Sequence, residues 1–262
     1  MSKPENVTAR GTVMRNLVVA AIVLLAAVLV TAVVARSERS REVTDVVNAD
    51  RTAPLVTKAS TERTREVAVI GDSYTSGTSV GGQGDRSWAR TVEKLIQRRI
   101  PNTKFKIAAI GGSGYVAQGS VQLTFRDQVR RVVNRNTDVV VLFGSRNDLI
   151  AENDQLQAAV TATLATVQSL SPSAKIIVIG PAWVNEYPPG GLLAQLRVIE
   201  LVANKFDVEA LDPVAARWFT TTTPDLIGSD NVHPNDAGHR MMAQKIYPLI
   251  LSAVDATAGM RG

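Results

Sequence analysis

Short apolar runs alternate with amphipathic segments from residue 67 of this chain onward. The apolar runs, which are the predicted strands, cover residues 67–70, 105–110, 138–143, 175–179 and 208–211. The run at 138–143 reads DVVVLF, and strands that are apolar throughout are typical of a parallel sheet covered on both faces. The pattern therefore predicts an α/β fold, a three-layer α/β/α sandwich with a five-stranded parallel sheet and right-handed crossovers.

The amphipathic segments between and after these runs have the spacing of helices. In the first of them, Trp88, Val92 and Ile96 fall on one face before Pro101. The predicted helices cover residues 88–99, 121–133, 156–170, 192–205 and 235–256. In an open parallel sheet the ligand site lies beyond the carboxyl ends of the strands, so functional residues are expected in the turns that follow the apolar runs.

The composition excludes several kinds of chemistry. The chain has no cysteine and only two histidines, so a disulfide scaffold, a cysteine nucleophile, an iron–sulfur site and a histidine-rich metal centre are all ruled out. We expect neither a metal nor a cofactor. The 29 Lys and Arg residues against 24 Asp and Glu residues give a net charge of +5, without a dense basic block. This charge pattern gives no indication of nucleic-acid binding.

A long apolar segment lies near the N-terminus, at residues 17–35, and it carries no charge. As a helix it would span about 28 Å, close to the hydrocarbon core of a bilayer. Three basic residues precede it, Lys3, Arg10 and Arg15. This arrangement favours an uncleaved signal-anchor. The alternative is a signal peptide cleaved near Ala35, although the apolar stretch is longer than the usual range of roughly 7–15 residues.

The anchor divides the chain into five predicted parts. Residues 36–65 hold seven basic and five acidic residues and few large apolar ones, which is typical of a solvated stalk or linker. The predicted order is a cytoplasmic tail at 1–16, the anchor at 17–35, the stalk at 36–65, a globular domain at 66–256 and a tail at 257–262.

The first predicted strand ends in Gly71-Asp72-Ser73-Tyr74, at a strand-to-helix turn. A serine there can expose its hydroxyl and place its own N–H near a helix N-terminus, which favours a developing anion. Gly-Asp-Ser is also ordinary turn chemistry. Ser73 is therefore a candidate nucleophile only if a base lies within reach.

His233 and His239 are the two histidines that could act as this base. Asp230 lies three residues before His233, and a tight turn could aim its carboxylate at the ring, fixing the tautomer and stabilising the imidazolium. His239 lies inside the last predicted helix without such a partner, and we expect a solvated helical histidine. The pattern favours His233 as the base for Ser73, with Asp230 as its orienting carboxylate.

Hydrogen-bond donors follow the next two strands. The glycine-rich turn at residues 111–114 can present a backbone N–H without an obstructing side chain. Asn147 could add a side-chain N–H, and the Ser73 N–H would complete a three-donor oxyanion hole. Arg146 could bind an anionic substrate group or form an internal salt bridge. Trp183, after the fourth strand, could line the substrate site.

These residues resemble the signature blocks of the SGNH (GDSL-type) hydrolases, namely Gly71-Asp72-Ser73, Gly112, Asn147, and Asp230 with His233. The resemblance covers residues 67–251. It implies a flavodoxin-like α/β/α fold and a serine esterase or acyl hydrolase without a metal. It further implies Ser73 as nucleophile, His233 as base and Asp230 as its orienter. The implied oxyanion donors are the Ser73 N–H, the Gly112 N–H and Asn147.

Two positions depart from the pattern of that family. The family commonly has Gly-x-Asn-Asp after the third strand, whereas here Ser145 holds the first place and Gly144 lies one place earlier. The family also usually has an asparagine several residues before the glycine of its second block, and residues 107–110 offer none. Gly112 is preferred over Gly114 as the glycine of the second block, although the asparagine that usually marks this block is missing.

Taken together, the resemblance and the apolar segment predict a membrane-anchored, extracytoplasmic serine esterase. The expected partners are an ester-bearing small molecule, lipid or glycan, and the membrane through residues 17–35. Because the domain would face the cell envelope, O-acyl groups on envelope carbohydrate are an expected substrate. Two alternatives stay open, an acyltransferase that uses the same triad and a non-catalytic envelope-binding module. The oligomeric state stays undetermined.

Overall fold

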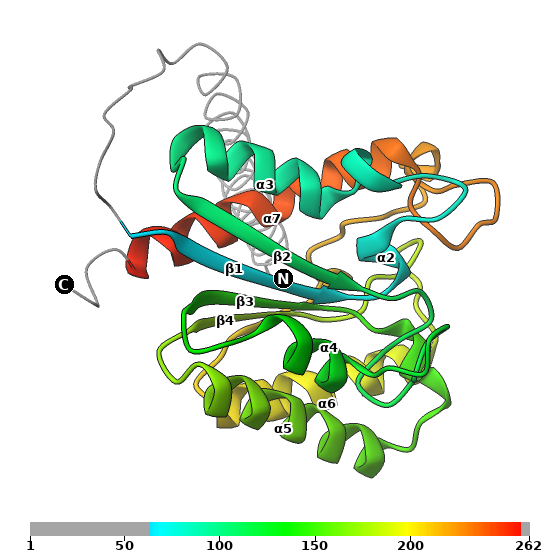
Figure 1. Ribbon diagram of the computed structural model, residues 1–262. Coiled ribbons are helices and arrows are strands. Elements are labelled where there is room, and N and C mark those ends of the chain that lie inside the picture. The colour runs from blue at the N-terminus through cyan, green and yellow to red at the C-terminus, as the bar shows by residue number, and fades with distance from the viewer. Residues whose placement is uncertain (1–62, 258–262) are drawn as a thin grey trace, which may run out of the picture. The chain divides into compact units, whose positions relative to one another are not determined.

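The computed structural model describes residues 63–257 (Figure 1). The predicted tail at 1–16, the predicted anchor at 17–35 with the alternative cleavage site near Ala35, and nearly all of the stalk at 36–65 lie outside the described residues. Between residues 63 and 257, no helix has the combination of length and apolar character needed to cross a membrane.

Five parallel strands form one sheet in the order β2-β1-β3-β4-β5. The strands are β1 (Arg65–Gly71), β2 (Thr103–Ala109), β3 (Thr137–Phe143), β4 (Lys175–Ile179) and β5 (Ala210–Leu211). Gly71 is level with Ala109 on one side and with Phe143 on the other, so the three neighbouring strands end at the same edge. The predicted five-stranded parallel sheet is confirmed.

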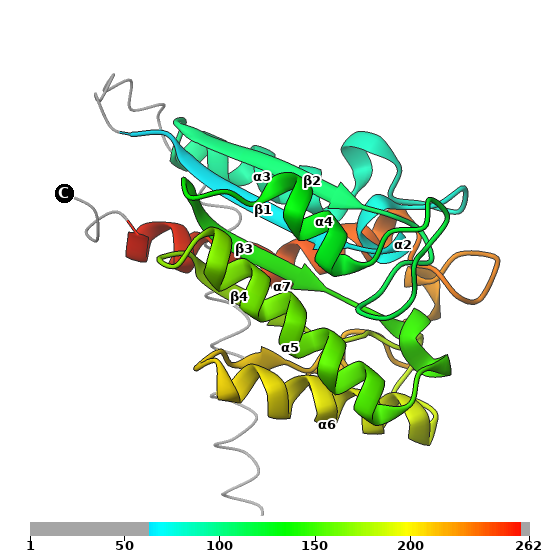
Figure 2. The ribbon, with the colours of Figure 1, turned by 60° about the horizontal axis from the view of Figure 1, so that its bottom comes forward.

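Helices cover both faces of this sheet (Figures 1 and 2). One face carries α3 (Trp88–Arg99) and α7 (Asp236–Ala256), and the other carries α4 (Phe125–Val132), α5 (Asn153–Leu170) and α6 (Gly190–Lys205). Short helices lie in the connections, α2 (Ser73–Ser76), η1 (Gly84–Arg86), η2 (Arg146–Ile150) and η3 (Pro224–Leu226).

Alternate residues of the central strands face two separate hydrophobic cores. On β1, Val69 packs in the core that contains Trp88 of α3, whereas Ile70 packs in the core that contains Phe125 of α4. Every residue of β3 is buried, which explains why its sequence does not alternate between polar and apolar residues.

Two elements are shorter than predicted, each because of a local hydrogen bond. The helix expected at 121–133 begins only at Phe125, because Thr124 and Asp127 form a capping box that fixes its N-terminus. The strand expected at 208–211 contains only residues 210–211. The Val208 N–H donates to the carbonyl oxygen of Ala203 at the end of α6 instead of joining the sheet.

His239 is buried, so the expectation of a solvated helical histidine is wrong. Its side chain lies between α7 and α3, where Nδ1 accepts the backbone N–H of Trp88 at 3.3 Å. Gly82 packs directly against the ring, because a Cβ at that position would lie 2.0 Å from Nε2. Burial lowers the pKa of His239 to about 4, which keeps the ring neutral.

The neutral His239 makes the fold sensitive to acid. Its pKa is about 4 in the folded state and 6.5 when unperturbed, so the unfolded chain binds more protons between these values. This group should therefore lower the free energy of unfolding by about 2 kcal/mol as the pH falls from 7 to 4.5. Urea unfolding of wild type and His239→Asn at both pH values measures it. An identical pH dependence in the two proteins would contradict the assignment.

Candidate active site

The carboxyl end of the sheet brings together the turn from β1 into α2, the loop after β2, η2 after β3 and the loop before α7 (Figure 1). The first of these turns is sharp. Asp72 caps α2 by accepting the Tyr74 N–H at 2.8 Å. A Cβ at Gly71 would lie 2.2 Å from the Thr75 hydroxyl, so the turn requires glycine. Ser73 consequently lies partly exposed at the first position of α2.

The structure places Ser73, His233 and Asp230 in one hydrogen-bonded line. The Ser73 Oγ lies 3.0 Å from His233 Nε2, and His233 Nδ1 lies 2.7 Å from Asp230 Oδ2. The other oxygen of Asp230 accepts the backbone N–H groups of Val232 and His233, both at 2.9 Å, which forms a tight turn. In this geometry the imidazole ring can take the proton of the serine hydroxyl while the carboxylate holds the ring.

The charge of Asp230 is stabilised by this turn. Desolvation alone would raise its pKa, but the hydrogen bonds from the His233 N–H, the His233 ring and the Val232 N–H outweigh it and lower the pKa to about 2. An ionised carboxylate favours a proton on His233 Nδ1. The Nε2 atom is then free to accept the proton of Ser73.

Three expected oxyanion donors lie in the turns that follow β1, β2 and β3, namely the Ser73 N–H, the Gly112 N–H and Asn147. Within residues 63–257, the backbone N–H groups of Ser73 and Gly112 donate no hydrogen bond. Asn147 Nδ2 donates one N–H to the Ser113 carbonyl oxygen at 2.8 Å and the other, over a longer 3.3 Å, to Asp72 Oδ2. These contacts join the residue after Gly112 to the residue before Ser73. The arrangement is suited to stabilising an oxyanion.

Asp148 is a site residue that the sequence analysis missed. Its carboxylate accepts the backbone N–H groups of residues 115, 116 and 117 at 2.7, 2.9 and 2.7 Å. A Cβ at Gly114 would lie 2.4 Å from Asp148 Oδ1, so the loop packs directly on the carboxyl group. Burial raises the pKa of Asp148, and the three N–H groups oppose that shift. Asp148 therefore ties the loop that carries Gly112 to the turn that carries Asn147.

The clamp made by Asp148 should support both stability and activity. In Asp148→Asn the amide keeps one acceptor oxygen but cannot accept all three N–H groups. We expect a loss of about 2 kcal/mol in unfolding free energy and a fall in kcat of roughly 10-fold. Urea unfolding and initial rates measure these effects, with the exposed Asp154→Asn as matched control. A variant with wild-type values for both would show that the clamp is dispensable.

Asp72 and Ser145 explain how the departure after the third strand, with Gly144 one place early, is accommodated. Gly144 has φ +127°, and a Cβ there would lie 2.9 Å from Asp72 Oδ2, so glycine is needed one place before the usual position. Burial, together with neighbouring Asp148, raises the pKa of Asp72 to about 7. Ser145 is buried, and its hydroxyl accepts the Asn147 N–H at 3.1 Å.

Arg146 and Trp183 lie against each other. The Arg146 guanidinium carbon is 4.2 Å from the centroid of the Trp183 ring, a cation–π contact. Its Nη1 atom lies 3.3 Å from the Tyr74 hydroxyl and 3.4 Å from the Val232 carbonyl oxygen. The internal salt bridge considered for Arg146 is not formed with any residue from 63 to 257.

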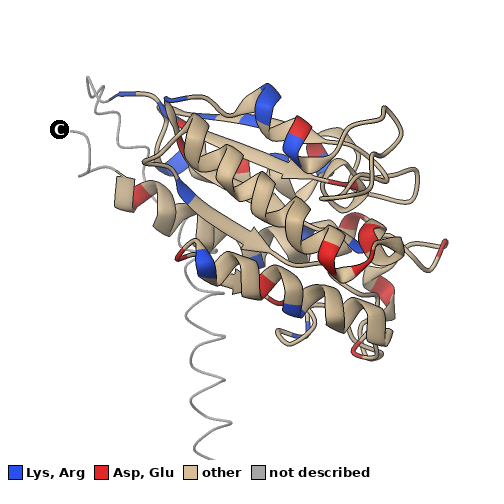
Figure 3. Cartoon of the chain, turned by 90° about the horizontal axis from the view of Figure 1, so that it is seen from below, with Lys and Arg blue, Asp and Glu red and all other residues tan. Residues whose placement is uncertain are grey.

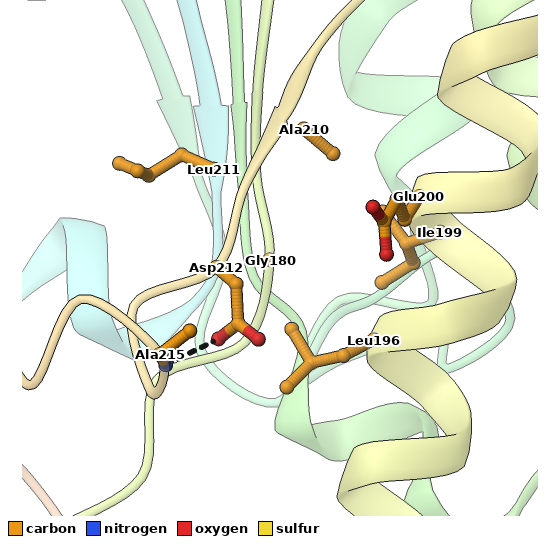
Figure 4. Close-up of a pocket in the computed structure, with 8 residues that line it drawn as sticks. All are labelled: Gly180, Leu196, Ile199, Glu200, Ala210, Leu211, Asp212 and Ala215. Atoms are coloured by element: carbon orange, nitrogen blue, oxygen red, sulfur yellow. Dashed lines mark hydrogen bonds between the residues drawn. The ribbon is translucent and has the colours of Figure 1, made fainter.

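A separate cavity of about 250 Å³ lies beside the edge strand β5 and α6 (Figure 4). Its charged side chains are Glu200 and Asp212. Asp212 Oδ1 accepts the backbone N–H groups of Val214 and Ala215 at 2.7 and 3.0 Å, so this carboxylate stabilises a turn. The triad residues do not line this cavity. The described residues also contain no group of three His, Asp or Glu side chains placed to hold a metal ion.

Residues 69–241 match the GDSL-like lipase/acylhydrolase family. The chain belongs to this family. As a GDSL-like hydrolase it is an ester-hydrolysing enzyme, and the resemblance drawn from the signature blocks is confirmed. It is 40% identical over 191 residues to the GDSL lipase Rv0518 of Mycobacterium tuberculosis, a match that covers 72% of this chain and 82% of that protein.

Solved structures with a similar fold include carbohydrate esterases. An active-site mutant of a family two carbohydrate esterase from Clostridium thermocellum matches with a TM-score of 0.55 at 17% identity, over 72% of this chain and 63% of that one. A family two carbohydrate esterase from Cellvibrio japonicus matches with a TM-score of 0.56 at 15% identity, over 75% and 63%. The GDSL-like hydrolase thus spans somewhat less than two thirds of these proteins, and the likeness concerns the fold.

Proposed function

We propose that this chain is a serine esterase that cleaves carboxylic esters through an acyl-enzyme. In this proposal Ser73 is the nucleophile, His233 the general base and Asp230 the carboxylate that orients it. The observation that carries the proposal is the line from the Ser73 hydroxyl through the His233 ring to Asp230, with separations of 3.0 and 2.7 Å. The backbone N–H groups of Ser73 and Gly112, which donate to no residue between 63 and 257, support it further.

The reaction follows from this geometry. The Ser73 oxygen attacks the ester carbonyl carbon while His233 Nε2 takes the hydroxyl proton. The resulting oxyanion accepts hydrogen bonds from the Ser73 N–H, the Gly112 N–H and Asn147. The protonated ring then gives its proton to the leaving alcohol, and an acyl-serine remains. Water repeats the two steps, releases the carboxylic acid and restores Ser73.

The proposal includes an O-acylated carbohydrate or lipid as substrate and a membrane location. Carbohydrate esterases among proteins of this fold and a relative named as a lipase support the first point. The apolar segment at 17–35 supports the second. In cell fractionation we expect the full-length protein to remain with membranes after washing at high pH. Recovery of only a soluble form that begins near residue 36 would contradict the anchor and support cleavage.

Labelling with a fluorophosphonate probe tests the chemistry directly, because the probe reacts only with an activated serine. Wild type should be labelled, and Ser73→Ala should not. Ser76→Ala is the matched control, because Ser76 lies in the same short helix and its hydroxyl donates to the Gly77 carbonyl oxygen rather than to a triad residue. Absence of label on folded wild type, or a label that persists in Ser73→Ala, would refute the proposal.

A further inference from the structure

Arg146 is a partly buried cation without an anionic partner among the described residues. Its contacts there are with the Trp183 ring, the Tyr74 hydroxyl and the Val232 carbonyl oxygen, and none of these carries a negative charge. Both of its hydrogen bonds to described residues use Nη1, so Nε and Nη2 donate to no residue between 63 and 257. The guanidinium therefore retains donor capacity and forms no salt bridge with a described residue. Its charge acts on Asp72 at longer range, where it opposes the rise in the pKa of that carboxyl.

Other arginines around this end of the domain are paired with carboxylates. Arg86 lies 3.2 Å from Asp236, and Arg217 lies 3.5 Å from Glu186. Both arginine side chains are more than half exposed, where pairing is worth little. Arg146 is less exposed than Arg86 and Arg217. A partly buried charge normally requires a group of opposite charge.

The position of Arg146 links it to the triad. It precedes Asn147 in η2, and its hydrogen-bond acceptors belong to Tyr74, which follows Ser73, and to Val232, which precedes His233. The Tyr74 and His233 ring centroids are 5.9 Å apart. The Tyr74 side chain thus lies between the Arg146 guanidinium and the His233 ring of the triad.

The acidic side chains of the site are already engaged by other groups. Around the carboxyl ends of the strands, Asp and Glu positions outnumber Lys and Arg positions (Figure 3). Asp230 is engaged by His233, and Asp148 is engaged by three backbone N–H groups. Burial raises the pKa of Asp72 to about 7, so Asp72 carries less than a full negative charge near neutral pH. Arg146 therefore lies at an end of the domain where acidic residues outnumber basic ones, and it forms no salt bridge with any of the described acids.

We propose that Arg146, packed over the Trp183 ring, binds an anionic group of the ester substrate, a carboxylate or a phosphate. The substrate class would be esters that carry such a charge close to the scissile bond. This inference rests on the proposed esterase function. A guanidinium presents a planar pair of donors that matches carboxylate and phosphate oxygens, and the contact with the Trp183 ring restricts its position in advance.

Matched pairs of esters test the inference. 3-Acetoxybenzoate and 3-acetoxybenzamide differ in charge on the alcohol side, and the 4-nitrophenyl monoesters of adipic acid and adipamic acid differ on the acyl side. Each pair is assayed with wild type, Arg146→Gln and Arg86→Gln. Wild type should favour the anionic member of at least one pair. Arg146→Gln should reduce that preference by roughly 10- to 100-fold, and Arg86→Gln should leave it unchanged.

The outcomes separate this inference from the esterase proposal. Hydrolysis without charge preference, or an equal loss for both members of a pair in Arg146→Gln, would overturn the inference alone. The second result would mean that Arg146 only balances the buried carboxyls. If wild type hydrolyses no ester, the esterase proposal fails. Binding of 3-hydroxybenzoate against 3-hydroxybenzamide, measured calorimetrically with wild type and Arg146→Gln, then still decides whether the anion site exists.

Discussion

Replacement of His233 by alanine is expected to lower kcat by about 10⁴- to 10⁶-fold. The Ser73 hydroxyl is a weak nucleophile unless a base takes its proton, and His233 Nε2, at 3.0 Å, is the base within reach. The residual rate should come from the oxyanion donors and from substrate binding. Initial rates on a soluble 4-nitrophenyl ester, together with fluorophosphonate labelling, measure the effect.

Two Asp-to-Asn variants in the loop before α7 separate loss of the triad from general damage to that loop. Asp230→Asn keeps the shape of the side chain but removes the negative charge that holds His233 Nδ1 at 2.7 Å. It should therefore lose about 10⁴-fold in kcat. Asp225→Asn removes an exposed carboxylate from the same loop and should retain wild-type kcat. Comparable rates for the two variants, or a His233→Ala enzyme with more than a tenth of wild-type kcat, would contradict the triad.

Local relationships in the chain were the ones that could be predicted from the sequence. The runs at 138–143 and 175–179 agree with β3 and β4 within one residue, because a strand buried on both faces needs a continuous apolar run. The contact between Asp230 and His233 was also predictable, since the two residues are three positions apart and meet through one turn. Whether the resulting pair acts in catalysis stays a proposal that the kinetic variants test.

Relationships that depend on tertiary structure were missed. The Asp148 carboxylate meets backbone N–H groups 31 to 33 positions earlier in the chain, and backbone groups leave no sequence signal. The burial of His239 and the start of α4, by contrast, do have signals in the sequence. His239 shares the apolar spacing of Met242, Ala243 and Ile246 on α7, which would have indicated burial. Thr124 and Asp127 have the spacing of a capping box and would have set the start of α4.

The second large effect is expected at Asn147. Its Nδ2 atom is held by the Ser113 carbonyl oxygen at 2.8 Å and lies 3.3 Å from Asp72 Oδ2, so the amide is oriented before substrate arrives. The N–H on the longer bond to Asp72 is the one that can be shared with the oxyanion, and an amide that is already oriented needs little reorganisation when the oxyanion forms. Removing one such donor typically costs about 10²- to 10³-fold in kcat, and we expect that loss in Asn147→Ala.

The effect of Asn147→Ala should fall on kcat much more than on KM, because the ester carbonyl gains its full negative charge only in the transition state. Inhibition by a trifluoromethyl ketone, which forms a tetrahedral adduct with an activated serine, should weaken by a similar factor. Asn153→Ala is the matched control, since Asn153 is exposed at the first position of α5. If Asn147→Ala raised KM alone, or weakened the ketone no more than Asn153→Ala does, Asn147 would be a structural residue, and the oxyanion would depend on the backbone N–H groups of Ser73 and Gly112.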